Sequence, residues 1–222
     1  MIEVLYEDNH LIAVNKKSGD IVQGDKTGDT TLSDFVKSYI KKKYNKPREV
    51  FLGTIHRLDR PTSGIVLYAR TSKALSRMNE QFRNKEVQKT YLAVVNNPPP
   101  NNSGTLENFL HKNQKQNKSY VTKDNNGKHA ALDYKLLKKL DNYFLLEIKP
   151  QTGRHHQIRV QLANIGCVIK GDLKYGSKRS NKDASIHLLA HKIKFMHPVK
   201  KESITIVAPA PKDSIWDFLS LR

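Results

Sequence analysis

A charged loop that leads directly into an apolar strand is the feature that most constrains this chain. Residues 65–69 are apolar and β-rich, which predicts a strand buried in a sheet. The loop in front of it, residues 53–64, holds two arginines, one histidine and a single carboxylate, Asp59. A loop anchored by a buried strand can fix a reactive side chain in place. Because Arg57 and Arg60 flank Asp59, its carboxylate is expected to stay ionised and oriented. The alternative is a turn in which Asp59 pairs with a surface arginine.

Short β-type runs recur along the rest of the chain, mostly at hairpin spacing, and three helices interrupt them. Strands outnumber helices, so the sequence predicts an α+β fold with a mixed, mainly antiparallel central sheet flanked by helices. One domain over residues 1–222 is expected. The predicted strands are 4–6, 11–14, 65–69, 87–95, 132–137, 143–148, 186–195 and 203–207; helices are predicted from Thr31 to about Lys43, from Ser72 through Phe82, and from Arg154 to Ile165, and Asp213 is predicted to cap a last short helix that carries Trp216 and Phe218.

The charge of the chain points to a polyanionic partner. Lys and Arg total 39 against 21 acidic residues, a formal net charge of +18. Such a surplus favours nucleic acid, although a solvated lysine-rich surface would give the same number. Aromatic residues make up only 8%, so an extended stacking platform for single strands is not favoured.

Features that are absent from the sequence limit the cell compartment and the kinds of cysteine chemistry expected for this protein. A single cysteine, Cys167, excludes an internal disulfide and a cysteine-based metal cluster, and its apolar neighbours predict a packed position. No apolar run approaches a membrane span, and the first residues enter a strand pattern without a signal sequence. A cytoplasmic monomer is therefore expected.

Four motifs in a fixed order resemble one enzyme family. The first is His56-Arg57-Leu58-Asp59 with Thr62-Ser63-Gly64, and the others span 89–95, 152–159 and 171–176. Together they are similar to the signatures of the RluA family of RNA pseudouridine synthases, from the first strand to the turn at 196–198. The resemblance implies a pseudouridine synthase-like fold with an active-site cleft across the sheet. It also implies isomerisation of uridine in ribosomal or transfer RNA, with no cofactor and no metal. Many members of the family carry a small N-terminal RNA-binding domain, and this chain is expected to lack one because its first residues already match the catalytic fold.

The resemblance assigns the catalytic role to Asp59. A carboxylate could attack C1′ or C6 of the nucleotide or stabilise charge at the sugar, and the sequence leaves this open. The family pattern predicts a salt bridge from Arg159 to Asp59. Arg154 and Arg159 are expected in the first turns of a helix, where the dipole disfavours cations, so anionic partners are indicated.

The remaining site residues also follow from the resemblance. Tyr91 would stack on the flipped uracil or move a proton, and stacking is favoured because a phenol is a poor base at neutral pH. The other interpretation of Tyr91 is an aromatic side chain packed in a strand. Arg57 would fill the gap left by the flipped nucleotide or hold a phosphate, Arg154 would bind RNA, and Leu188 would contact the target base. The loop would be supported by His56, Thr62, Ser63 and Gly64.

Two other classes of protein would also explain parts of this sequence. A metallohydrolase could use His155 and His156, or His187 and His191, but the second pair would lie about 13 Å apart along a strand, so this class is rejected. A non-catalytic RNA-binding or ribosome-associated protein explains the charge. It does not explain a carboxylate at the centre of a cationic cluster. An inactive member of the family is disfavoured by the intact set Asp59, Tyr91 and Arg159.

Overall fold

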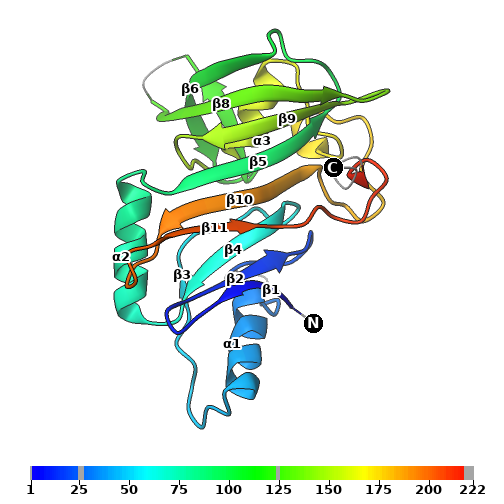
Figure 1. Ribbon diagram of the computed structural model, residues 1–222. Helices are drawn as coiled ribbons and strands as arrows, with labels where there is room; N and C mark the ends of the chain where they lie inside the picture. The colour runs from blue at the N-terminus through cyan, green and yellow to red at the C-terminus, as the bar shows by residue number, and fades with distance from the viewer. Residues whose placement is uncertain (1, 25–27, 124–125, 218–222) are drawn as a thin grey trace. The chain divides into compact units, whose positions relative to one another are not determined.

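Two stretches of chain that are distant in sequence form one unit, and the stretch between them forms another. The computed structural model describes residues 2–24, 28–123 and 126–217 (Figure 1). The first unit comprises Met1–Gln88 and Ala190–Arg222, and the second comprises Lys89–Leu189. The predicted α+β class and the mainly antiparallel sheet are confirmed. The expectation of one domain over 1–222 stays a prediction.

The first unit is built on a sheet with the order β1-β2-β4-β10, in which β3 pairs with β4 and β11 with β10. The predicted hairpin of β1 and β2 is confirmed, and β2 continues the sheet by pairing antiparallel with β4. All seven residues of β4 are buried, so both of its faces are covered. The strands are β1 (Glu3–Glu7), β2 (Leu11–Lys16), β3 (Gly53–Thr54), β4 (Ser63–Ala69), β10 (Leu188–Met196) and β11 (Ser203–Val207).

Helix α1 (Leu32–Lys43) covers part of this sheet and begins where its sequence predicts. Thr31 caps it in a capping box with Asp34, and three lysines lie in its last turn. Leu32, Val36 and Ile40 pack on apolar residues of β2 and β4. Helical spacing predicts Phe35 on the same face as Leu32 and Val36, but it is 51% exposed. At 100° per residue it lies at the edge of the apolar stripe, where burial is incomplete.

Helix α2 (Ser72–Arg83) follows β4 and packs against β3 and β4. Thr71, one residue before the predicted start, caps it by accepting a hydrogen bond from the amide of Ala74. Met78 is fully buried, which confirms the predicted apolar face. Close packing against β3 leaves no space for a side chain at Gly53, where a Cβ would lie 2.6 Å from Leu75 Cδ2.

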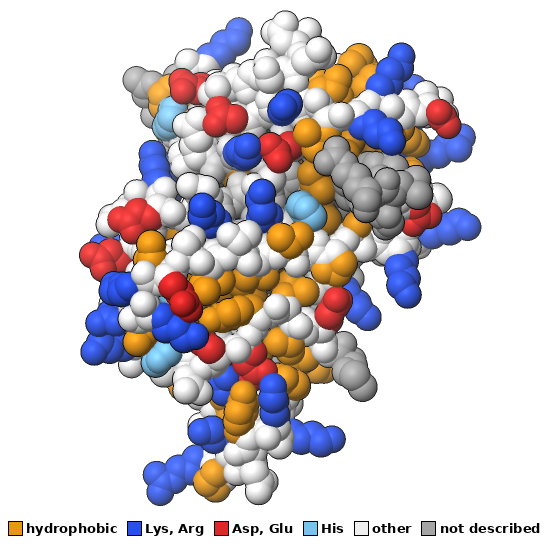
Figure 2. All heavy atoms as spheres, viewed as in Figure 1, with side chains coloured by type: hydrophobic (Ala, Val, Ile, Leu, Met, Phe, Trp, Pro, Cys, Tyr) orange, Lys and Arg blue, Asp and Glu red, His pale blue; other side chains and the backbone are white. Residues whose placement is uncertain are grey.

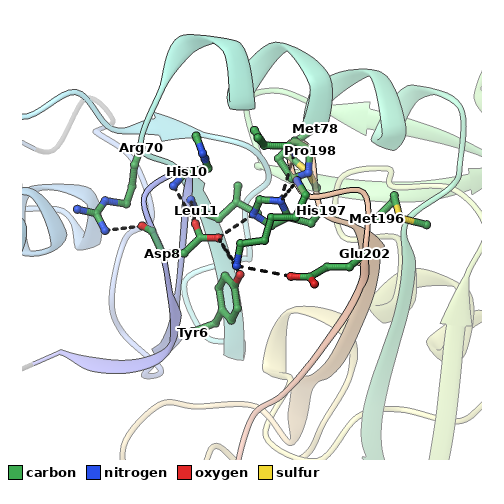
Figure 3. A network of polar contacts seen from close by, with 12 residues as sticks. Tyr6, Asp8, His10, Leu11, Arg70, Met78, Met196, His197, Pro198 and Glu202 are labelled. Carbon is green, nitrogen blue, oxygen red and sulfur yellow. Dashed lines mark hydrogen bonds and ion pairs between the residues drawn. The ribbon is translucent and has the colours of Figure 1, made fainter.

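A polar network joins the N-terminal hairpin to the turn after β10 (Figure 3). The Nε2 atom of His197 lies 2.7 Å from Asp8 Oδ2, and its Nδ1 atom accepts hydrogen bonds from the amides of Val199 and Lys200. The Tyr6 hydroxyl donates to the same carboxylate oxygen of Asp8. Since Nδ1 accepts two hydrogen bonds, Nε2 is the ring nitrogen that donates to Asp8. The ring is fully buried, so this network is part of the packing of the first unit.

The second unit is an antiparallel sheet with the order β5-β9-β8-β6-β7. Strands β6 and β7 were not predicted. The predicted run at 132–137 lies within the longer β8, and the run at 143–148 begins one residue before β9 and ends two residues before its end. Strand β6 alternates exposed and half-buried residues over most of its length, a weak apolar signal. The strands are β5 (Gln88–Val95), β6 (Ser103–Asn113), β7 (Lys118–Thr122), β8 (Lys128–Lys139) and β9 (Phe144–Pro150).

Helix α3 (Gln157–Asn164) packs on this sheet between two apolar clusters. Ile158 and Leu162 join the cluster of β5, β8 and β9, and Val160 joins a cluster with Leu110 and Tyr175. The predicted start at Arg154 was wrong by three residues. His156 has a left-handed backbone with φ of 53°, which ends the helical conformation on the N-terminal side. A short 3₁₀ helix, η1 (Leu173–Tyr175), follows further along the chain.

Two smaller predictions can also be assessed. Cys167 is fully buried in the main cluster of the second unit, as its apolar neighbours predicted, and burial raises the pKa of its thiol to about 11. Near the C-terminus, the Asp213 carboxylate accepts a hydrogen bond from the amide of Ile215, and Trp216 is buried. Phe218, predicted in the same helix, lies outside the described residues. In the part of the chain that the structure describes, no helix is long and apolar enough to cross a membrane.

Candidate active site

Asp59 is half-buried in the loop that precedes β4, at the place the sequence predicts. The amide of Thr62 donates to the carbonyl oxygen of Asp59 at 3.0 Å, which closes a turn directly after the carboxylate. Arg57 and Arg60 are exposed on either side, and Arg60 pairs with Asp29 at 3.5 Å. The loop therefore presents one carboxylate between two cationic side chains.

The end of this loop fits tightly against the sheet. Thr62 and Ser63 are buried, and Gly64 has a φ of +112°, a conformation that favours glycine. A Cβ at Gly64 would collide with the backbone carbonyl of Ala190 and lie 2.7 Å from its amide nitrogen. A side chain at position 64 would thus displace the turn that carries Asp59.

Lys16 supports the same loop from its buried side, although Lys16 belongs to none of the sequence motifs. Its side chain is 1% exposed, and Nζ donates to the carbonyl oxygens of Lys17, Arg60 and Thr62 at 3.0, 2.9 and 2.7 Å. Burial lowers the pKa of Lys16 to about 8, against the opposing effect of the carboxylates of Asp20 and Asp59. At neutral pH an ammonium group therefore satisfies backbone carbonyls on the C-terminal side of Asp59.

His56 joins the start of the loop to the packed helices and strands behind it. Its Nε2 atom accepts a hydrogen bond from the amide of Leu67 in β4 at 3.1 Å. Its ring stacks on Phe82 of α2 with 5.4 Å between centroids. These contacts tie His56 to β4 and α2; its role in supporting the active-site loop stays a prediction.

Two predicted residues of the second unit lie on strands. Tyr91 is half-buried on β5, opposite Ile148 of β9, and packs against the main apolar cluster. Leu188 begins β10, is 3% exposed and belongs to the same cluster. The expected contact of Leu188 with a target base stays a prediction.

Arg159 is held by a buried carboxylate to which the sequence motifs assign no role. Its Nε and Nη2 atoms donate to Oδ2 and Oδ1 of Asp172 at 2.7 and 2.8 Å, a bidentate pair. The two side chains are 5% and 1% exposed. The guanidinium also lies 5.1 Å from the ring centroid of Tyr175. Asp172 and Tyr175 therefore fix the orientation of this guanidinium within the second unit.

Arg154 lies in the turn before α3 and is exposed. Its amide donates to Oε1 of Gln157 at 2.9 Å, and its Nε atom donates to the carbonyl oxygen of His129 at 2.9 Å. Thr152 donates its hydroxyl to the same oxygen of Gln157. The Gln157 side chain thus caps the turn in place of the N-cap residue. Its hydrogen bond to the Arg154 amide also fixes the backbone position from which the Arg154 side chain extends.

His156, the N-cap residue of α3, is an uncharged part of this unit. Burial lowers the pKa of His156 to about 2, and the nearby cations Arg159, His155, Lys174 and Lys112 act in the same direction. Its Nδ1 atom lies 3.0 Å from the Tyr175 hydroxyl. His156 therefore helps to place Tyr175, which contacts Arg159.

The predicted site residues thus form two groups. The first unit holds the loop group, namely His56, Arg57, Asp59, Thr62, Ser63 and Gly64, and the second holds Tyr91, Arg154, Arg159 and Leu188. The expected salt bridge from Arg159 to Asp59 would join the two units and stays a prediction. Lys16 and Asp172 were missed; the Gly-Asp motif at 171–172 was the one available signal for the second.

Solved structures define the class of fold. The human RNA pseudouridylate synthase domain containing 4 superposes with a TM-score of 0.81 over 99% of this chain and 92% of that chain, at 23% identity. The human RNA pseudouridylate synthase domain containing 1 gives a TM-score of 0.78 over 98% of this chain and 87% of that chain, at 22% identity. The fold is therefore that of the pseudouridylate synthases.

Sequence comparison then identifies the family. The model of the RNA pseudouridylate synthase family matches residues 10–164. The ribosomal large subunit pseudouridine synthase C of Buchnera aphidicola subsp. Baizongia pistaciae is 35% identical over 214 residues, which cover 93% of this chain and 66% of that protein. The ribosomal large subunit pseudouridine synthase D of Borreliella burgdorferi is 33% identical over 205 residues, 91% and 63% of the two chains. The chain belongs to the RNA pseudouridylate synthase family, whose members are isomerases, and spans about two thirds of the length of these relatives.

Proposed function

We propose that this protein converts uridine to pseudouridine in ribosomal RNA of the large subunit, with Asp59 as the catalytic carboxylate. The reaction breaks the bond from C1′ of the ribose to N1 of uracil, turns the base and joins C1′ to C5. The proton on C5 is lost and N1 gains one, so no electrons are exchanged. Asp59 would form and release a covalent bond at C1′ or C6, or stabilise the charge at the sugar.

The observation that carries this proposal is the construction of the Asp59 loop. Its carboxylate lies between two exposed arginines, while Lys16, Gly64 and the Thr62 turn hold its backbone from the buried side. A surface ion pair would need no such support, because exposed pairs contribute little to stability. A carboxylate that must meet one carbon atom of a flipped nucleotide does need it.

Two features support RNA of the large subunit as the substrate. The named relatives of this chain are synthases of the ribosomal large subunit, and the net charge of +18 favours a polyanion. Transfer RNA, the other class expected from the resemblance, is the alternative. With ribosomal RNA as substrate, we place the reaction in the cytoplasm.

Substitution of Asp59 by asparagine tests the proposal. The asparagine side chain keeps the shape of aspartate but cannot act as a nucleophile, so pseudouridine formation should fall by at least about 10⁴-fold. Unmodified large-subunit RNA is incubated with each protein, and pseudouridine is mapped by sequencing. Asp29→Asn is the matched control, since it removes a carboxylate that pairs with the neighbouring Arg60. It should leave conversion unchanged.

Binding separates the enzyme from the rival class, a non-catalytic RNA-binding protein. Asp59→Asn should bind large-subunit RNA at least as tightly as the natural protein, because it removes one negative charge. If the natural protein binds this RNA and converts no uridine in ribosomal or transfer RNA, the non-catalytic class is correct. Conversion that persists in Asp59→Asn would refute the role of Asp59.

A further inference from the structure

The turn end of the β6–β7 hairpin is fastened by polar contacts to the turn before α3 and to η1. The Ser119 hydroxyl donates to the carbonyl oxygen of His155 at 2.7 Å, and the Ser119 amide donates to the Tyr175 hydroxyl at 2.9 Å. Lys174 donates from Nζ to the carbonyl oxygen of Asn117 at 3.1 Å. His155 contacts the side chain of Asn117 through Nε2 at 3.1 Å. The hairpin is thereby held at a defined place beside the turn that carries Arg154.

Cationic side chains gather around this junction. Lys112 lies directly opposite Ser119 in the β6–β7 ladder, and Lys118 starts β7 with Nζ 5.1 Å from the ring centroid of Tyr175. The guanidinium carbon of Arg159 lies at the same distance from that ring centroid. Because both groups lie 5.1 Å from the same ring centroid, the charges of Lys118 and Arg159 are at most twice that distance apart. This limit equals about three spacings between neighbouring phosphates of a nucleic-acid strand, at roughly 3.4 Å each.

These cations have no carboxylate partners in the described part of the chain. Lys112, Arg154 and Lys174 are exposed and Lys118 is half-buried, and none of the four has an ion pair within 4.0 Å among the described residues. Asp172, the carboxylate of this junction, is buried and bound to Arg159. A partner with several negative charges would relieve the mutual repulsion of these cations.

The charges of these cations also act on the buried interior of the second unit, to which they belong. Burial lowers the pKa of His156, and the charges of Arg159, Lys174 and Lys112 add to this effect. The imidazole of His156 therefore stays neutral at the centre of the junction, and it does not add to the charge that an anionic partner must balance.

We propose that Lys112, Lys118 and Arg154 form a binding surface for the sugar-phosphate backbone of the RNA substrate. Lys174 and His155 hold the hairpin in place through the contacts described above. This inference rests on the proposed function and adds to it a location for the substrate strand. Contacts of this kind set the register of the RNA and give no base specificity. The surface is called the junction surface below.

The test measures how RNA binding depends on salt. Lys112→Gln and Lys118→Gln each remove one charge and keep a polar side chain. For each, the slope of log K against log salt should become less steep by about 0.7 to 0.9, the value for one phosphate contact. At 100 mM salt this corresponds to a loss of roughly five- to eight-fold in affinity for each variant. The probe is large-subunit ribosomal RNA transcribed in vitro, measured by filter binding.

Two controls separate local charge from other effects. Lys73→Gln removes one exposed lysine from α2 in the first unit and should leave the slope unchanged. Lys112→Arg keeps the charge and should restore the slope that Lys112→Gln loses. Because these residues contact backbone rather than the reacting base, the variants should raise KM for RNA and leave kcat at saturating RNA within about two-fold.

The experiment can contradict the proposed junction surface and still leave the proposed reaction supported. If the double variant Lys112→Gln/Lys118→Gln keeps the slope of the natural protein while pseudouridine still forms, the RNA backbone lies elsewhere. An equal loss of slope in Lys73→Gln would also overturn the proposal, because the effect would then be one of net charge. If the natural protein neither binds nor modifies the RNA, the proposed function fails together with this inference.

Discussion

Lys16 shows how a single buried charge can support a reactive loop. Its ammonium group has three N–H donors, and three backbone carbonyls accept them. Taking a charge out of water is unfavourable, so such a lysine persists only where its hydrogen bonds are complete. Two of the three acceptors, Arg60 and Thr62, follow Asp59 within three residues. The buried charge therefore acts on the backbone that carries the Asp59 carboxylate.

Replacing Lys16 by methionine should loosen this loop. The carbonyl of Thr62 would lose its donor, while those of Lys17 and Arg60 would keep one from the amides of Asp20 and Gly19. We expect a decrease of about 1 to 3 kcal/mol in the free energy of unfolding. The kcat for pseudouridine formation should fall, because the Asp59 backbone is no longer fixed. Urea denaturation and single-turnover conversion measure the two effects. Lys17→Met, an exposed neighbour, is the matched control and should change neither. Equal stability of the two variants would show that the Lys16 hydrogen bonds have no energetic role.

At this scale the sequence revealed motif residues but few of their partners. Asp59 and Arg159 stand in motifs that a reader of the sequence can find, and both occupy defined, supported positions. Lys16 lies at the end of an apolar strand, where a lysine usually points to water. Asp172 follows a glycine in a motif without an obvious role. Their functions depend on contacts 13 to 46 residues away in sequence, which no local pattern contains.

Among the elements, α3 is the one whose start matters most for the site. The amphipathic pattern predicted a helix from Arg154, yet His156 takes a left-handed conformation and the helix begins at Gln157. The side chain of Gln157 caps the preceding turn, a role that helix propensities do not reveal. Strand β6 was missed for a related reason: its alternation is weak, and its pairing with β7 and β8 determines its conformation. By contrast, Thr31 and Thr71 carry local capping chemistry, so both other helices could be predicted closely.

The start of α3 should make the protein sensitive to mild acid. The pKa of His156 is about 2 in the folded chain, lowered by burial, and about 6.5 in the unfolded chain. Between these values the unfolded chain binds a proton that the folded chain does not, so stability rises with pH and is lost on acidification. One such group changes the free energy of unfolding by at most about 1.4 kcal/mol per pH unit.

His156→Asn isolates this contribution. Asparagine tolerates the left-handed backbone and does not titrate. Urea unfolding at pH 7, 6 and 5 should show a decrease for the natural protein that is steeper than for the variant, by roughly 1 kcal/mol between pH 6 and 5. This pH range lies above the ordinary pKa values of carboxyl groups, so the change in the free energy of unfolding across it comes mainly from histidines. Parallel pH profiles would mean that His156 does not control acid stability.

For the whole molecule, net charge alone does not locate the RNA. Figure 2 shows Lys and Arg side chains scattered over the visible face, with acidic and apolar side chains between them. Among the described residues some cations are paired, for example Lys43 and Arg70 with Glu7, and others have no acidic partner. The junction surface differs because several cations without an acidic partner lie around one polar junction between the β6–β7 hairpin and the turn before α3. The charge of +18 therefore predicts the class of ligand, and the grouping of cations at this junction indicates where we expect that ligand to bind.

The chain path of the first unit makes its stability depend on contacts between distant segments. This unit is completed only when the chain returns at Ala190, and the hydrogen bond between Asp8 and His197 joins residues that are 189 positions apart. Closing a long loop has an entropic cost that contacts between its ends must offset. The network around His197 should therefore contribute measurably to folding.

His197→Phe tests this contribution. Phenylalanine keeps a ring of similar shape but leaves the amides of Val199 and Lys200 without their acceptor. We expect a loss of about 2 to 4 kcal/mol in the free energy of unfolding, since two donors become unsatisfied. Trp216, the single tryptophan, is 3% exposed in the same unit, so its fluorescence during urea denaturation reports the change. As a control, Glu202→Gln removes only the exposed pair with Lys200 and should lower the free energy of unfolding by less than about 0.5 kcal/mol. If both variants unfold at the midpoint of the natural protein, the network in Figure 3 does not hold the two chain segments together.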